Sequence, residues 1–237
     1  MTSGLLPRLD RETVELARKT LSREGYVILT DRELGLPGSV RENIHRDYFR
    51  GGVLRNYPGD IPADRERARD VVRYDWQGEE LQLREHNCVA IDKRGDWSSE
   101  RREFEQVPLL DSPDFARWIH AAISLVPENR RQPRGTFGVN LFRTHTDVVT
   151  RPHQDEEEFI FVYVVDKVGS GAETLLFDVE SDEVVLQETL RPGELLVFED
   201  SRFRHGTTPI IPPVIGTARR DALVCTINFP HTYPLEG

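Results

Sequence analysis

Apolar and polar residues form short alternating runs along the second half of the chain, and turn-forming residues separate these runs. From residue 136 onward, Gly-Ser-Gly, Glu-Ser-Asp, Arg-Pro-Gly and Pro-Pro segments interrupt stretches rich in valine, isoleucine, leucine and phenylalanine. This pattern predicts closely spaced strands of a sandwich or barrel. The expected strands are 136–143, 158–168, 172–179, 183–190, 194–199, 203–211 and 222–229.

The first half of the chain has helical periodicity instead. Residues 10–24 place apolar side chains on one face, begin with an aspartate that can cap a helix and are followed by a glycine that can end it. A second helix is expected over 39–49, with Ser39 as its N-cap. A third begins at Ser112, with proline at its first helical position, and must end before Pro127. Short strands are expected at 26–29, 73–76 and 88–91.

Helices followed by strands predict an α+β protein with a mainly β core. We expect a jelly roll, that is, a cupin-like double-stranded β-helix supported by N-terminal helices. A chain of 237 residues fits one domain. Within it, residues 1–135 would form a helical N-terminal elaboration with a few strands, and residues 136–230 a jelly-roll core that binds a metal.

Charge and composition narrow the range of partners. The formal net charge of −10 disfavours nucleic acid, whose phosphates would be repelled. The segment Arg65–Arg69 alternates arginine with acidic and small residues, which we interpret as a salt-bridged surface. No apolar run is long enough to cross a bilayer, and the first residues lack the apolar core of a signal peptide. We therefore expect a cytoplasmic protein without a membrane partner.

The two cysteines, Cys88 and Cys225, stand in no metal or redox spacing. We expect both to be packed thiols, and Cys225 to lie within a strand. The sequence does not indicate an oligomeric state.

A histidine and an aspartate two positions apart, His153 and Asp155, directly precede the apolar run 159–165. Pro152 favours an extended backbone here, and residues i and i+2 of an extended segment point to the same side. One imidazole and one carboxylate can therefore converge on one point. His205, from a later predicted strand, would complete two histidines and one carboxylate, the facial triad of non-haem Fe(II) sites.

Two other His-x-Asp pairs occur in the sequence. His45 and Asp47 lie in a predicted helix, where positions i and i+2 do not face each other, so we interpret them as a solvated helix face. His145 and Asp147 follow a predicted strand, but no long apolar run begins after them, and we prefer the later pair. The histidines with no ligand spacing, interpreted as ordinary polar residues, are His86, His120 and His231.

Three motifs together resemble a known family. These are His153-Gln154-Asp155 before an aromatic-rich strand, the segment 192–205 ending in His205, and Arg219-Arg220-Asp221 opening the last strand. Their order resembles the Fe(II)/2-oxoglutarate-dependent dioxygenases, and more closely the bacterial subgroup that hydroxylates free amino acids (isoleucine 4-hydroxylase-like). The resemblance covers residues 136–230 well and the first half only in outline. That subgroup usually carries glycine directly after the metal aspartate, where this chain has Glu156, and paired glycines with serine where this chain has residues 171–174.

The resemblance implies a set of cofactors and the residues that hold them. Fe(II) would be bound by His153, Asp155 and His205, with 2-oxoglutarate as cosubstrate and O2 as oxidant. Arginine suits the distal carboxylate of 2-oxoglutarate because its planar guanidinium can donate two hydrogen bonds. We assign this role to Arg220, with Arg219 as the alternative. We assign Thr207 to the cosubstrate as well and Thr174 to the substrate, although Thr174 or Thr226 could also contact that carboxylate.

For the substrate we expect Arg143 to bind a carboxylate, with an ion pair to Glu157 or Glu158 as the alternative. Glu157 could receive an ammonium group. Asp200 could support the metal site from behind or bond a turn, and we favour the turn.

The expected reaction is hydroxylation of an unactivated C–H bond of a free amino acid or a similar small polar metabolite, with formation of succinate and CO2. Two alternatives remain open at this stage. One is a cupin-like metal-dependent isomerase or hydrolase that does not use 2-oxoglutarate. The other is a non-catalytic metal-binding β module.

Overall fold

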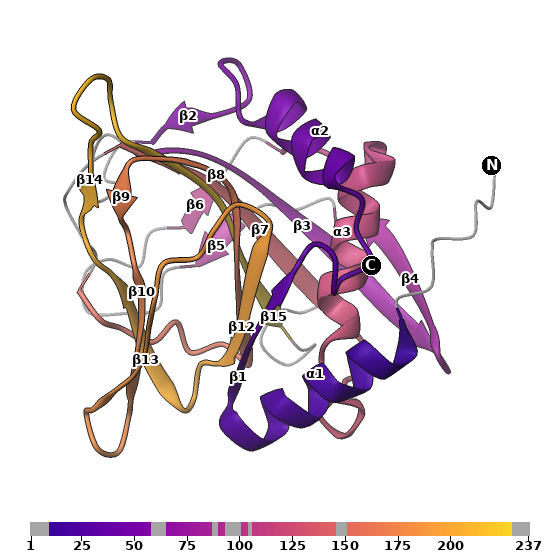
Figure 1. Cartoon of the computed structure of the whole chain (residues 1–237). Coiled ribbons are helices and arrows are strands. Elements are labelled where there is room, and N and C mark those ends of the chain that lie inside the picture. Colours follow the sequence, from indigo (N-terminus) through magenta and orange to yellow (C-terminus); the bar gives the residue numbers. More distant parts are fainter. Residues whose placement is uncertain are drawn as a thin grey trace.

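The computed structural model describes residues 10–57, 65–86, 90–92, 101–103, 106–145 and 151–228 (Figure 1). In this part of the chain, strands predominate and three α-helices accompany them. The helices are α1 (Arg11–Glu24), α2 (Gly38–Tyr48) and α3 (Pro113–Ser124), with 3-10 turns at Leu109–Asp111 and Glu128–Arg130.

The strands form one large antiparallel sheet and several smaller ones. The large sheet has the order β1-β12-β8-β15-β7-β3-β2, with β4 added on β3. Its strands are β1 (Tyr26–Thr30), β2 (Arg55–Asn56), β3 (Glu66–Gln77), β4 (Glu80–Glu85), β7 (Arg134–Thr144), β8 (Phe159–Val168), β12 (Glu194–Glu199) and β15 (Arg219–Asn228). The smaller sheets use β5 (Ala90–Asp92), β6 (Arg101–Glu103), β9 (Ser170–Gly171), β10 (Thr174–Asp178), β11 (Val184–Glu188), β13 (Phe203–Thr207) and β14 (Ile210–Ile211).

The two faces of the large sheet bury different cores. On the helix face, Phe161 and Cys225 pack in one cluster with Phe115 and Trp118 of α3. On the opposite face, which we call the inner face, Ile160, Val162, Leu196 and Val224 pack with residues of the three-stranded sheet β11-β10-β13. Two antiparallel sheets enclosing a core, backed by helices, make up the predicted jelly roll, and the α+β prediction is confirmed.

Alternation along the strands assigns each side chain to one of these faces. On β3, Ala68, Val72 and Tyr74 belong to the core on the helix face. Arg67 and Arg69, which stand on either side of Ala68, therefore lie on the inner face. This assignment matters for the site described below.

Most predicted elements form, and their caps explain why. Asp10 accepts a hydrogen bond from the Thr13 amide at 3.1 Å, and Gly25 ends α1 with a φ of 81°. Ser112 caps α3 by accepting from the Phe115 amide. The prediction of Ser39 as the cap of α2 is wrong: Pro37 is the N-cap, because its extended ψ of 143° leads directly into a helix that begins at Gly38.

Three strand predictions needed correction. The strand predicted at 172–179 spans Thr174–Asp178, the run 203–211 divides into β13 and β14, and β3 extends from residue 66 rather than from 73. Because β3 pairs with β7 from Glu66 to Asp75, the first half of the chain contributes to the large sheet itself and not only to an elaboration around it. Cys225 is fully buried in β15 as a free thiol, as predicted, whereas Cys88 lies outside the described residues. No helix in the described ranges is both long and apolar enough to span a membrane.

Candidate active site

His153 and His205 are brought together by backbone hydrogen bonds. The His153 amide donates to the His205 carbonyl at 3.1 Å, and the His205 amide donates to the His153 carbonyl at 2.9 Å. His205 lies on β13, whereas His153 lies in the segment before β8, outside a regular strand. Residues 52 positions apart in the sequence are thus fixed side by side by a local antiparallel bridge.

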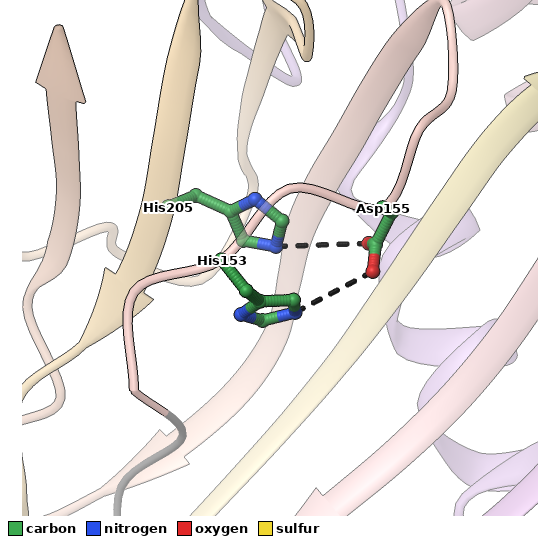
Figure 2. Close-up of side chains that lie close together, drawn as sticks. All are labelled: His153, Asp155 and His205. Atoms are coloured by element: carbon green, nitrogen blue, oxygen red, sulfur yellow. Dashed lines mark ion pairs between the residues drawn. The ribbon is translucent and has the colours of Figure 1, made fainter. Parts of the chain in front are cut away.

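Asp155 completes a group of three side chains that face one point (Figure 2). Its carboxylate oxygens lie 3.4 Å from Nε2 of His153 and 3.7 Å from Nε2 of His205. Two ligands bonded at right angles to one ion at about 2.1 Å would be about 3 Å apart. The three donor atoms are therefore close to the spacing that an ion requires. The side chains of His153 and Asp155 are 41% and 38% exposed, so one side of the site is open to incoming molecules.

The tautomer of His153 suits a metal ligand. Its Nδ1 lies 2.9 Å from the backbone carbonyl of Arg151, which can only accept a hydrogen bond. Nδ1 therefore carries a proton, which leaves Nε2, the nitrogen that faces Asp155, to bind a metal ion when the imidazole is neutral.

Asp200 contacts both the backbone around Asp155 and the imidazole ring of His205. It is buried, and its Oδ2 accepts hydrogen bonds from the amides of Asp155 at 2.9 Å and Glu157 at 3.1 Å. Its Oδ1 lies 3.7 Å from Nδ1 of His205, and both of these buried atoms lack a hydrogen-bond partner in the described structure. Asp200 therefore bonds the turn, as we favoured, and also stands behind a metal-facing histidine. Metal-ligating histidines usually have such a carboxylate on their second nitrogen.

The pKa shifts of His205 and Asp155 favour the charge states that metal ligation needs, whereas the shift of His153 favours its protonated form. Burial lowers the pKa of His205 to about 4, so its imidazole is neutral near pH 7. Burial acts to raise the pKa of Asp155, but the hydrogen bond from His153 and the charges of both histidines lower it overall. The hydrogen bond to Asp155 raises the pKa of His153. The site thus offers a carboxylate and imidazole nitrogens, the donor set expected for non-haem Fe(II).

Arg220 and Arg219 differ in their partners. Arg219 forms an ion pair with Asp166. Arg220 has no carboxylate partner in the described part of the chain, and its guanidinium donates only a long hydrogen bond, of 3.4 Å, to Oγ1 of Thr174. Its Nε is buried without a partner, and burial lowers its pKa to about 10, so it remains a cation at neutral pH. Thr207 stands directly opposite Thr174 in the pairing of β10 with β13.

Arg143 lies elsewhere. Its guanidinium donates to both oxygens of Asp221 at 2.8 Å and to the carbonyl of Phe49, which follows α2. Since Leu141 and Leu223, two positions from Arg143 and Asp221, belong to the core on the helix face, this ion pair is on that face too. The structure therefore does not bring Arg143 together with the metal residues. Arg143 does not form an ion pair with Glu157 or Glu158 in the described structure either.

Two interpretations of the sequence are wrong. Arg67 and Arg69 were expected on a salt-bridged surface but are only 8% and 7% exposed, because the segment is an internal strand of the sheet, between β7 and β2. His45 was expected on a solvated face, but its Nε2 lies 2.9 Å from the buried carboxylate of Asp221. His45, Asp166 and Asp221 converge like metal ligands, yet two arginines already offset the acids.

His145 and His120 lie apart from the site. His145 lies near the carbonyl of Ala218 and the carboxylate of Glu66, and Asp147 is outside the described residues. His120 is half-buried on α3, where burial lowers its pKa, and His231 is also outside the described residues.

A jelly roll that holds two histidines and one carboxylate at ligand spacing, with a half-buried arginine on the same inner face that has no carboxylate partner among the described residues, defines the class of Fe(II)-dependent oxygenases that use a dicarboxylate cosubstrate. The Nε of Arg220, which has no hydrogen-bond partner in the described structure, fits a carboxylate of 2-oxoglutarate. The Oδ1 of Asp200 and the Nδ1 of His205, which also lack partners there, fit a histidine that ligates Fe(II).

Sequence comparison identifies the family. The profile of the 2OG-Fe dioxygenase family matches residues 44–226, and the chain belongs to this family. Its cofactors are accordingly Fe(II), 2-oxoglutarate and O2. Among curated proteins, none matches the chain.

Solved structures share the fold at low sequence identity. A BsmA homologue from Methylobium petroleophilum is 23% identical, with a TM-score of 0.78 over 91% of this chain and 92% of the other. IDO from Bacillus thuringiensis is 16% identical, with a TM-score of 0.69 over 95% and 99%. A 2OG-Fe(II) oxygenase family oxidoreductase from Burkholderia pseudomallei is 16% identical, with a TM-score of 0.57 over 96% and 95%.

Proposed function

We propose that this 2-oxoglutarate-dependent oxygenase hydroxylates an unactivated C–H bond of a free amino acid or a similar small polar metabolite. The observation that carries the proposal is the open triad of His153, Asp155 and His205, which has acidic and basic side chains next to it. The acidic chain, of net charge −10, makes nucleic acid an unfavourable substrate.

Each residue has a defined task in the proposal. His153, Asp155 and His205 hold Fe(II), which with O2 and 2-oxoglutarate supplies C–H oxidation, with succinate and CO2 as co-products. Arg220 fixes the distal carboxylate of the cosubstrate. Thr174 and Thr207 lie opposite each other in the pairing of β10 with β13, and their hydroxyl groups orient that carboxylate.

Glu157 receives the ammonium group of the substrate. Its side chain is half-buried two positions after Asp155, and burial together with the charge of Asp155 raises its pKa to about 8. A bound cation would stabilise its charged form, because an opposite charge favours ionisation.

The proposal is tested with purified protein, Fe(II), ascorbate and 2-oxoglutarate against a panel of free amino acids that includes ornithine, citrulline and pipecolate. We expect a mass gain of one oxygen in one amino acid, coupled to succinate formation. Asp155→Ala should abolish both iron binding and turnover, whereas the matched control His145→Ala should retain them. If no amino acid is turned over by protein that demonstrably binds iron, the proposed substrate class is wrong.

A further inference from the structure

A second basic residue, Lys167 of β8, stands directly opposite Arg220 of β15. The two strands are antiparallel, and their register pairs Arg220 with Lys167. Leu223 of β15 belongs to the core on the helix face, so Arg220, three positions earlier, points to the inner face. Directly opposite residues of such a pair carry their side chains on the same face, with Cβ atoms about 4.5–5.5 Å apart. Lys167 therefore lies on the inner face beside Arg220.

An irregularity in β8 turns Lys167 to this face. Val165 packs on the helix face, so strict alternation would send Lys167 there as well. The register of β8 against β15 shifts at Val165, which is an extra residue in the pairing of these two strands. Beyond it the side chains change faces: Asp166 is opposite Asp221, on the helix face, and Lys167 points inward. Bulges often re-aim a side chain next to an active site, and this one places a lysine beside Arg220.

Lys167 and Arg220 both reach toward the beginning of β10. Nζ of Lys167 donates to the carbonyl of Gly171, three residues before this strand, and Arg220 donates to Oγ1 of Thr174, its first residue. The lysine can donate further hydrogen bonds, because an ammonium group carries three donors. The two basic groups thus border the same end of the inner face, where we place the distal carboxylate of 2-oxoglutarate.

Within the described ranges, neither basic group forms an ion pair. Like charges directly opposite each other in a sheet are destabilising. Burial and the charge of Arg220 lower the pKa of Lys167, whereas the charge of Glu173 raises it. The carboxylate of Glu173 accepts hydrogen bonds from Gln187 at 3.1 Å and from Thr208 at 3.4 Å rather than from the lysine. A carboxylate bound between Lys167 and Arg220 would offset their repulsion and supply an acceptor for the unpartnered Nε of Arg220.

We infer that Lys167 is a second cation for the distal carboxylate of 2-oxoglutarate, opposite Arg220, and that it strengthens the preference of the site for a dicarboxylate. Arg220 can bind this group through two parallel hydrogen bonds, and Lys167 adds a point charge from the neighbouring strand. This role rests on the proposed role of Arg220. It does not depend on which substrate is oxidised.

The test measures binding without turnover. The full-length protein is loaded with Mn(II), and calorimetry gives the Kd of 2-oxoglutarate and of 2-oxopentanoate, in which a methyl group replaces the distal carboxylate. We expect the wild type to bind 2-oxoglutarate more tightly. Lys167→Met should weaken 2-oxoglutarate about 10-fold and leave 2-oxopentanoate within about threefold, because a charge-assisted hydrogen bond to the distal carboxylate is lost.

Further variants separate charge from structure. Lys167→Gln keeps a donor for the Gly171 carbonyl but no charge, and it should weaken 2-oxoglutarate as Lys167→Met does. Lys167→Arg keeps the charge and should bind 2-oxoglutarate within about threefold of the wild type. Arg220→Met should weaken 2-oxoglutarate about 10- to 100-fold. Lys19→Met, which removes an exposed lysine from α1, is the matched control and should bind both ligands like the wild type.

The outcomes distinguish the role of Lys167 from that of Arg220. If only Arg220→Met weakens 2-oxoglutarate, the inference is overturned and the role of Arg220 stands. Equal weakening of both ligands by Lys167→Met would show that the lysine acts on the fold or the metal, which also overturns the inference. If neither variant changes the preference for 2-oxoglutarate, or if the wild type shows no preference, both assignments are wrong. No arm requires an amino acid, so the proposed substrate class is tested separately.

Discussion

Asp200 is the side chain on which the order of the metal site depends, and its replacement gives a prediction with a calculable size. One oxygen accepts the amides of Asp155 and Glu157, and the other faces Nδ1 of His205. Asp200→Ala would leave two partly buried amides without an acceptor, at a cost of up to about 1–3 kcal/mol each. Supporting residues of this kind change metal affinity about 10- to 100-fold. Asp200→Asn keeps an acceptor for the amides but removes the negative charge behind His205.

We therefore expect Asp200→Ala to weaken Co(II) binding about 100-fold and to lower the unfolding midpoint, and Asp200→Asn to weaken binding about 10-fold at nearly native stability. Anaerobic competition titrations against a coloured chelator measure the affinities, and thermal unfolding of the metal-free proteins measures stability. Equal Co(II) affinity in the wild type and both variants would show that the reasoning about Asp200 is wrong.

Three other predictions concern residues with defined environments. Burial raises the pKa of Asp70 to about 7, above about 3.9 in the unfolded chain, so the folded state holds a proton that the unfolded state releases between these values. Stability should therefore fall as pH rises from about 4 to 7, by at most about 1.4 kcal/mol per pH unit, and denaturant titrations should show a flatter dependence for Asp70→Asn. Glu156 has a φ of 61°, so Glu156→Val should be less stable than Glu156→Gly by about 1–2 kcal/mol in the same assay, and equal midpoints would contradict the strain argument. Arg220→Met should raise the KM for 2-oxoglutarate about 10- to 100-fold in steady-state kinetics, and a larger effect of Arg219→Met would reverse the assignment.

The sequence predicted those features whose signals are local. Caps at Asp10 and Ser112 lie within a few residues of the amides they bond, so propensity alone locates α1 and α3. The strand 194–199 was predicted with its observed bounds, because turn residues bracket a continuous apolar run. His153 and Asp155 stood out because a buried strand follows them.

What sequence reasoning missed depended on partners distant in the chain. Arginine at alternate positions of β3 resembles a solvated surface until β7 is known to pair with Arg67 and Arg69, and β2 with Arg67. Arg143 and Arg69 both stand on paired strands, but only the register shows that they point to opposite faces. The role of Asp200 required the turn at Asp155 to be folded against it. A run of arginines at every second position was the one available signal for the arginines of the inner face.

The backbone bridge between His153 and His205 has a consequence for how the protein is handled. Both residues are positioned by amide–carbonyl bonds that exist in the polypeptide itself. The iron therefore does not need to assemble its own binding site, in contrast to small zinc domains that collapse when stripped. Chelation should yield an intact, reloadable apoprotein, into which a spectroscopically useful or redox-inert ion can be exchanged without a refolding step.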